Sequence, residues 1–281
     1  MVRIDAHQHF WSLARGDYGW LTPALTPIYR DFSPNDLAPL LSARGIDKTI
    51  LVQAAPTFAE TLYLLELAER APFVAGVVGW IDFDAADATS TIAKVAAGHP
   101  LLVGLRPMLH DIADDDWLLR PNLAAVFEAM TVQGLVLDAL ARPQHLPRVQ
   151  EICERHPNLT VVVDHIAKPL IRERRLDPWR ADIAAVARCS NAVCKLSGIA
   201  TEAAPDWIVD GIKPYVDHVF EAFGPQRLLW GSDWPVVDLA GGYVRWWDAT
   251  MALLKPLDAV ARGAILGGNA ARIYLSHRGR S

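Results

Sequence analysis

Eight short apolar segments, spaced along the whole chain, constrain its fold more than any other feature. Several are near-continuous runs of β-branched residues, as at positions 50–52 and 161–163, which is typical of strands buried on both faces of a parallel sheet. Longer stretches with helical spacing separate them, and this alternation is the signature of βα units. We expect the strands at residues 3–7, 49–53, 74–80, 102–106, 135–138, 160–165, 192–196 and 228–231.

The stretches between the strands carry helix start and stop signals. Ser33 precedes Pro34, the arrangement of an N-cap followed by proline, and Gly45 stands where that helix must end. Thr57 and Glu60 have capping-box spacing and open a helix that runs to about residue 70. Eight strands with intervening helices in 281 residues predict an α/β fold, a (β/α)8 TIM barrel that forms one domain over residues 1–281. A doubly wound sheet would show fewer strands or a second domain.

Composition and charge exclude several classes of protein. Hydrophobic residues make up 52% of the chain and charged residues 21%, a globular balance. The net charge of −5 lacks the basic footprint of a nucleic-acid binder. The first residues lack the apolar region of a secretory signal, no run is long enough to span a membrane, and the 3 cysteines form no C-x-x-C pair. We therefore predict a cytoplasmic protein that binds neither nucleic acid nor membrane.

In a barrel of this kind the chemistry lies at the C-terminal ends of the strands. Asp5, His7 and His9 end the first strand, and their spacing of two predicts that all three point the same way. His165 ends the sixth strand and Asp233 follows the eighth. Taken singly, His165 could be a core histidine and Asp233 a helix N-cap. Together His7, His9, His165 and Asp233 form a set of three nitrogens and one oxygen that suits zinc or a related metal, with a position left for water.

Two further features bear on the site. Arg106 ends the fourth strand, where it would bind a carboxylate or polarise a carbonyl, the alternative being a salt bridge toward a helix. Residues 10–32 carry turn residues and several aromatic side chains, and predict a wall or lid over the site. Glycine-rich phosphate loops, a nucleophile elbow and an H-E-x-x-H motif are absent from the sequence. No nucleotide cofactor is therefore expected.

Four motifs together resemble the amidohydrolase superfamily, in the branch of the sugar-acid lactonases, which includes L-fuconolactonases and L-rhamnonolactonases. They are Asp5-Ala-His7-Gln-His9-Phe-Trp11, Asp164-His165-Ile-Ala-Lys168-Pro169, Lys195-Leu-Ser-Gly198 and Gly231-Ser-Asp233-Trp-Pro235. The resemblance implies a (β/α)8 hydrolase that opens the ester ring of an aldonolactone, with a small-molecule lactone as its partner. It also implies that His7, His9 and His165 are the catalytic histidines and that Asp233 activates water.

The same resemblance bears on cofactor and substrate. Asp138 and Lys195 stand where superfamily members with two metals carry a bridging group, so at most one divalent metal, zinc, is expected, and catalysis without metal stays open. Arg106, Asp138, Trp20 and Trp117 are predicted to contact the substrate, with loop packing as the alternative for the tryptophans. A mouth with a single arginine favours a neutral sugar lactone over a dicarboxylate.

Two other functions are alternatives to the predicted lactonase. One is a metal-dependent decarboxylase of the same superfamily, although such relatives usually carry another histidine where this chain has Val193-Cys194-Lys195. The other is a barrel that binds a sugar acid without converting it, but all the strand-end residues that catalysis needs are present.

Overall fold

Eight parallel strands follow one another around a sheet in chain order, in the computed structural model that describes residues 2–276. Each lies within about two residues of its predicted position. The (β/α)8 barrel predicted from the sequence is therefore confirmed. The strands are β1 (Ile4–Gln8), β2 (Lys48–Val52), β3 (Val74–Gly79), β4 (Leu102–Leu105), β5 (Val136–Ala139), β6 (Val161–Val163), β7 (Ala192–Leu196) and β8 (Leu228–Trp230).

Hydrogen bonds just beyond β8 close the barrel onto β1. The amide nitrogen of Asp233 donates to the carbonyl oxygen of His7 at 2.8 Å, and the amide of His9 donates to Trp234 at 2.8 Å. Gln8 and Trp234 form an isolated parallel bridge at the same place. We call these contacts between residues 7–9 and residues 233–234 the seam of the barrel. The seam includes candidate site residues at the ends of the first and last strands.

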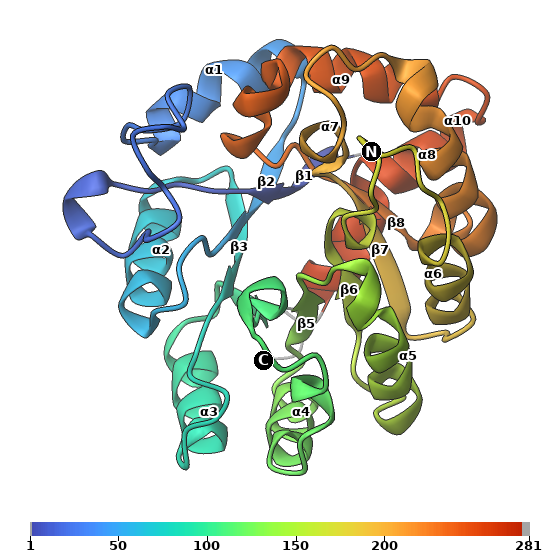
Figure 1. Ribbon diagram of the computed structural model, residues 1–281. Helices are drawn as coiled ribbons and strands as arrows, with labels where there is room; N and C mark the ends of the chain where they lie inside the picture. The colour runs from blue at the N-terminus through green and yellow to red at the C-terminus, as the bar shows by residue number, and fades with distance from the viewer. Residues whose placement is uncertain (1, 277–281) are drawn as a thin grey trace.

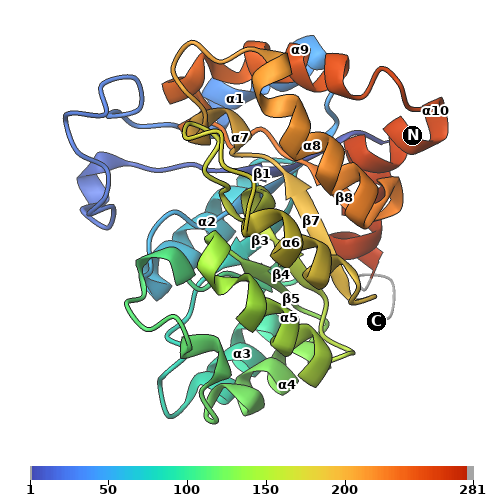
Figure 2. The same cartoon turned by 45° about the vertical axis from the view of Figure 1, so that its right-hand side comes forward.

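Helices surround the barrel on its outside (Figure 1), and the turned view shows the same arrangement from another side (Figure 2). The predicted caps of the first are confirmed, since Ser33 and Asp36 cap its start and Gly45 ends it in a left-handed conformation. The helices are α1 (Pro34–Arg44), α2 (Phe58–Arg70), α3 (Ala88–Gly98), α4 (Leu123–Val132), α5 (Leu146–Arg155), α6 (Trp179–Ala187), α7 (Ile199–Glu202), α8 (Val209–Phe223), α9 (Gly242–Leu253) and α10 (Ala259–Gly263). No helix in residues 2–276 is long and apolar enough to cross a membrane.

The start of α2 differs in part from the predicted capping box. The Thr57 hydroxyl accepts a hydrogen bond from the Glu60 amide at 3.1 Å, as expected. The Glu60 carboxylate does not return to Thr57 but accepts from the amides of Ala54 and Ala55, at 3.0 and 2.8 Å. Glu60 is buried and holds the loop that follows β2. This loop forms part of the wall of the candidate site.

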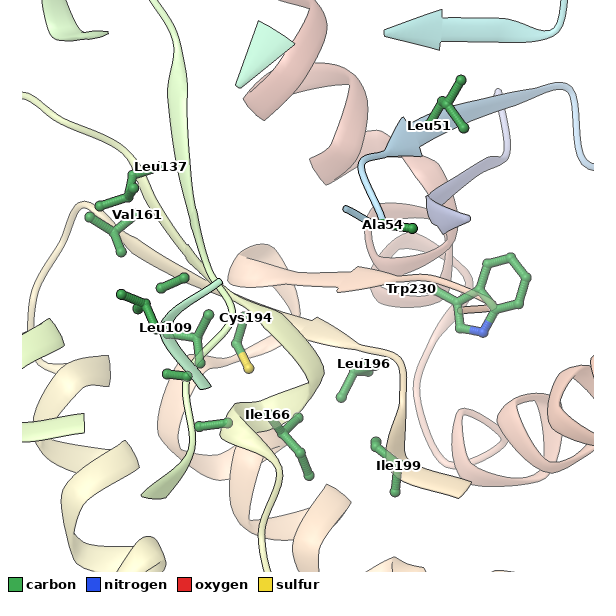
Figure 3. Close-up of a cluster of buried hydrophobic side chains, with 14 of the residues drawn as sticks. Leu51, Ala54, Leu109, Leu137, Val161, Ile166, Cys194, Leu196, Ile199 and Trp230 are labelled. Atoms are coloured by element: carbon green, nitrogen blue, oxygen red, sulfur yellow. The ribbon is translucent and has the colours of Figure 1, made fainter. Parts of the chain in front are cut away.

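Two apolar clusters lie on the two faces of the sheet. The inner cluster takes residues from the strands, such as Val162 and Leu229, and from the C-terminal segment, such as Ile273. The outer cluster packs the strands against the helices, and Figure 3 shows part of it, including Cys194 and Leu196 of β7. With both faces buried, the strands need continuous apolar runs, which explains the sequence pattern.

Candidate active site

A cavity of about 200 Å³ opens at the C-terminal ends of the strands. Its walls come from the segments that follow β1, β2, β4, β5, β6 and β8. This is the end of the barrel where the sequence predicts chemistry. The polar and aromatic residues around it include His9, Trp20, Arg106, His165, Lys168 and Asp233.

Three imidazoles converge on one carboxylate oxygen. The Nε2 atoms of His9, His7 and His165 lie 3.4, 3.8 and 3.9 Å from Oδ1 of Asp233. All four side chains are buried, with at most 5% exposed. The structure therefore brings together the complete set of three nitrogens and one oxygen that the sequence singles out.

The Nδ1 atom of each imidazole, on the side of the ring away from Asp233, contacts another protein group. Nδ1 of His9 lies 2.8 Å from the carbonyl oxygen of Val52, so it carries the proton and Nε2 presents a lone pair. Nδ1 of His165 bonds the Ser197 hydroxyl at 2.9 Å. In metal sites, hydrogen bonds of this kind to the nitrogen that does not bind the metal orient the histidine ligands. The donor set thus suits one zinc ion, and His9 and His165 are oriented as ligands in this way.

Nδ1 of His7 faces a buried network of charges inside the barrel. The Lys195 ammonium lies 3.2 Å from this nitrogen and 3.0 Å from Oδ1 of Asp164, and it also pairs with Asp138. The Tyr274 hydroxyl donates to Asp138 at 2.8 Å. Both carboxylates and the ammonium are fully buried. Sequence reasoning assigned no role to Asp164 and used Lys195 only to argue against a second metal, although both stand in motifs that carry the resemblance.

Asp138 lies within this network, and the cavity-lining residues do not include it. Its side chain points from the middle of β5 into the barrel, where Lys195 and Tyr274 occupy both carboxylate oxygens. The predicted contact between Asp138 and substrate therefore has no support in the geometry.

Asp5 does not share the orientation of the two histidines on β1. The pairing of β1 with β2 shifts register between Asp5 and Gln8, and this irregularity interrupts the alternation of side chains. Asp5 instead accepts hydrogen bonds from the Ser232 amide at 2.8 Å and from the hydroxyl of Tyr243 in α9 at 3.3 Å. The prediction that all three side chains point the same way is therefore wrong for Asp5.

Arg106 faces the cavity and is not a helix-facing salt bridge. Its guanidinium donates to the carbonyl oxygen of Gln53 and lies 3.4 Å from Oδ2 of Asp164 and 3.4 Å from Nε2 of His7. Only 3% of the side chain is exposed. Arg106 therefore joins the cavity wall to the buried network beneath it.

The two predicted aromatic contacts separate in the structure. Trp20, in the loop that follows β1, lines the cavity, and its indole nitrogen donates to the carbonyl oxygen of Ala54 at 2.8 Å. Trp117 lines a neighbouring cavity, packs edge-on against Phe83 and donates to Asp84 at 2.8 Å. Trp20 thus forms the wall expected of residues 10–32, whereas Trp117 matches the alternative of loop packing.

The environment sets the charge of the site. Burial raises the pKa of Asp233, but the neighbouring His165 and His9 outweigh this effect, and the net pKa lies below its usual value. Burial lowers the pKa of His7 and of His165 well below the usual histidine value, and the Lys195 ammonium adds to the effect at His7. At neutral pH Asp233 is therefore an ionised carboxylate, and His7 and His165 are neutral imidazoles, the forms that can accept a proton or bind a metal.

A left-handed turn follows β6 and carries two of the cavity residues. His165, Ile166, Ala167 and Lys168 have φ values of 54, 47, 59 and 49°. Residues with a Cβ adopt this conformation at a cost of roughly 1–2 kcal/mol each, and seldom in succession. None of the four is glycine, so the sequence contains no local signal of the turn. Such strain concentrates where function requires a fixed geometry.

Comparison with known proteins finds relatives over nearly the full length of the chain. The chain matches the amidohydrolase family over residues 4–275. It is 45% identical over 278 residues to an L-fucono-1,5-lactonase of Burkholderia ambifaria, a match that covers 97% of this chain and 95% of that protein. It is 37% identical over 295 residues to an L-fucono-1,5-lactonase of Burkholderia multivorans, covering 97% and 96%.

A solved structure extends the comparison to the fold. The crystal structure of an amidohydrolase from Burkholderia multivorans with bound zinc is 36% identical and superposes with a TM-score of 0.92, covering 98% of this chain and 99% of that one. Sequence and fold agree over nearly the full length of both chains. The protein therefore belongs to the amidohydrolase family.

Proposed function

We propose that this protein is a hydrolase that opens the ring of a sugar-acid 1,5-lactone, with L-fucono-1,5-lactone as the first candidate. The observation that carries the proposal is the convergence of three imidazoles on the Asp233 carboxylate at the floor of a cavity of about 200 Å³. The activity named for the relatives that are 45% and 37% identical supports the same substrate class.

Zinc is the metal that the residues suit best. His7, His9 and Asp233, whose ligand atoms lie within 4.8 Å of one another, would hold it together with His165, whose Nε2 lies 3.9 Å from Oδ1 of Asp233. The zinc in the structure of the relative that is 36% identical supports this assignment. When bound, zinc polarises a carbonyl and makes water a stronger acid. A second ion beside Asp164 is disfavoured, because the Lys195 ammonium already lies 3.0 Å from that carboxylate. The site is therefore expected to hold a single ion.

Asp233 is the base of the proposed reaction. Its ionised carboxylate takes a proton from the attacking water while the water oxygen bonds to the lactone carbonyl carbon. The bond between that carbon and the ring oxygen then breaks, and Asp233 returns the proton to the ring oxygen. The products are the open-chain hydroxyl and a carboxylic acid, which releases its proton at neutral pH. Arg106 stands on the cavity wall where its positive charge favours the developing oxyanion.

The charges around the cavity favour a neutral substrate. Arg106 lies 3.4 Å from the Asp164 carboxylate, and Lys168, a second cation on the wall, lies 2.7 Å from the Glu202 carboxylate. The wall therefore carries a lysine beside its single arginine, and each of the two cations has its own carboxylate. A dicarboxylate would need cations free of such partners. Trp20 offers an aromatic face to the apolar side of a sugar.

A panel of substrates tests the proposal. The purified protein would be given aldono-1,4- and 1,5-lactones, including L-fucono-1,5-lactone, a pyrone dicarboxylate and aromatic carboxylic acids, with acid release followed by a pH indicator and carbon dioxide measured. We expect acid release to be fastest with a neutral six-carbon or 6-deoxy sugar lactone. A dicarboxylate lactone with a kcat/KM at least about tenfold higher would overturn the substrate class. Carbon dioxide release would instead identify a decarboxylase.

A further inference from the structure

The left-handed turn gives Lys168 a fixed place beside the reacting groups. His165 and Lys168 stand at its two ends and line the same cavity, while Ile166 and Ala167 between them are fully buried. The Lys168 amide donates to the His165 carbonyl at 2.9 Å, and the indole of Trp179 donates to the Ile166 carbonyl at 2.7 Å. Ile166 belongs to the apolar cluster of Figure 3. These hydrogen bonds and the buried side chains fix the backbone of the turn. The turn places both Lys168 and His165 in the cavity wall.

Lys168 has hydrogen-bond donors left for a ligand. Its ammonium donates to Oε1 of Glu202 at 2.7 Å, the one hydrogen bond it makes within residues 2–276. An ammonium carries three donors. The other cation on the wall, Arg106, is only 3% exposed, and its two terminal nitrogens bond Gln53 and Asp164; its Nε has no partner within residues 2–276 but is buried. Lys168 is therefore the cation on this wall that is best able to donate to a substrate.

The depth of Lys168 indicates which part of a substrate it meets. Its side chain is 22% exposed, against 4% for His165 and 5% for Asp233, so it lies nearer the mouth than the groups at the floor. The reacting carbonyl must lie at the floor beside Asp233. Lys168 consequently faces the part of a lactone ring away from the carbonyl, which in a sugar lactone carries hydroxyl groups.

Glu202 determines what kind of group Lys168 can bind. This carboxylate ends α7 and lies on the ammonium, so the pair offers donors without a net positive charge. Neutral hydroxyl oxygens suit such donors better than a carboxylate does. We propose that Lys168 is a substrate-binding residue that donates hydrogen bonds to the ring hydroxyls of the lactone, with Glu202 orienting it. This inference rests on the proposed lactonase function.

The test compares a hydroxylated lactone with the same ring without hydroxyls. Lys168→Met removes the donors and keeps an unbranched stem. We expect the KM for the preferred sugar 1,5-lactone to rise at least about tenfold, with kcat changed less than about threefold, because a charged hydrogen bond to substrate is lost. δ-Valerolactone, measured as a competitive inhibitor of the same reaction, should keep its inhibition constant within about threefold, because it has no hydroxyls to lose.

Matched variants separate binding from a structural effect. Lys213→Met removes a lysine of an exposed ion pair with Asp217 on α8, and should change neither constant. Lys168→Arg keeps donors and should restore most of the affinity. Glu202→Gln leaves Lys168 without its carboxylate, so the aldonate product should inhibit more strongly, by about threefold or more. This variant tests the inference even where Lys168→Met does not fold.

Five results would overturn the inference. The KM of Lys168→Met could stay within about threefold of wild type, or it could rise together with the inhibition constant of δ-valerolactone, which lacks hydroxyls. A loss of kcat at unchanged KM would place the lysine at the reacting atoms instead. Unchanged product inhibition in Glu202→Gln would show that this carboxylate does not determine what Lys168 binds. A wild-type protein that hydrolyses no lactone would refute the proposed function first, and the inference with it.

Discussion

The amide nitrogen of Asp233 donates a hydrogen bond to the carbonyl oxygen of His7 at 2.8 Å. These two residues lie near opposite ends of the chain, and this bond helps to close the barrel. It also fixes the carboxylate of one residue 3.8 Å from the imidazole of the other. Closure of the fold and assembly of the site therefore depend on the same contacts, so a change at the seam should affect both.

Asp5→Ala tests this dependence on the seam. The Asp5 carboxylate accepts hydrogen bonds from the amides of Ser232 and His7, at 2.8 and 3.2 Å, and the variant leaves both amides buried without that acceptor. We expect the free energy of unfolding in urea to fall by about 2–4 kcal/mol, and zinc affinity to fall with it. Asp217→Ala, which removes a carboxylate from an exposed ion pair, should cost less than about 1 kcal/mol. Equal effects of the two variants would contradict the role given to Asp5.

Metal content tests the single-ion assignment. The donor set around Asp233 suits one zinc ion, and Lys195 disfavours a second ion at Asp164. Elemental analysis of the purified protein, without added chelator, is expected to find at most about one equivalent of metal. His9→Gln, which removes one proposed ligand, should lower that content. Two tightly held equivalents would show that the charge of Lys195 does not exclude a second ion.

Removal of Lys195 tests the buried charge network. Lys195→Met leaves Asp138 and Asp164 buried without their shared cation. We expect the free energy of unfolding to fall by about 3–5 kcal/mol, the usual effect of breaking a buried ion pair from one side. The double variant Lys195→Met with Asp138→Asn removes one of the uncompensated charges and should recover part of the loss. A double variant less stable than the single one would mean that the network is held by something other than charge.

The fold could be predicted because each strand is buried on both faces. That burial requires apolar runs, and these are visible in the sequence as segments such as residues 161–163. Once the barrel is inferred, residues at strand ends fall on one rim, and the structure does bring His7, His9, His165 and Asp233 together there. Predicting which strand-end residues lie near one another on the rim requires only the order of the strands.

The differences between prediction and structure arise where local backbone departs from regular geometry. The register shift on β1 turns Asp5 away from the histidines, and sequence alternation carries no sign of it. Lys168 reaches the cavity through a left-handed turn that lacks glycine, the residue that usually marks such a conformation. Asp138 and Trp117 have suitable chemistry, but they point into the barrel and into loop packing. Those orientations depend on tertiary contacts that the sequence does not display.

The buried Glu60 carboxyl should make stability depend on pH. Burial raises the pKa of Glu60 from 4.5 to about 7 in the folded protein, so the folded state binds a proton that the unfolded chain has lost. The stabilising effect is complete below pH ~4.5 and disappears as the pH rises to ~7. Glu60→Gln removes this dependence, and its unfolding free energy relative to wild type should therefore increase between these pH values, by up to about 3 kcal/mol.

Urea unfolding at several pH values measures this effect. Glu69→Gln changes an exposed residue of the same helix, and its difference from wild type should stay within about 0.5 kcal/mol across the range. If the stability of Glu60→Gln relative to wild type instead decreased with rising pH, the buried carboxyl would be stabilised in its ionised form by the Ala54 and Ala55 amides.

The kcat of Asp233→Asn on the preferred lactone tests the proposed mechanism most directly. The substitution keeps the shape of the side chain and removes its charge and its basic oxygen, so kcat should fall by about 10²–10⁴ while KM changes much less. Metal content is measured on the same sample, so that loss of the ion is not mistaken for loss of the base. Asp248→Asn, on the exposed side of α9, should retain wild-type kcat. A folded Asp233→Asn variant with more than about a tenth of the wild-type kcat would contradict the role of Asp233 as the base.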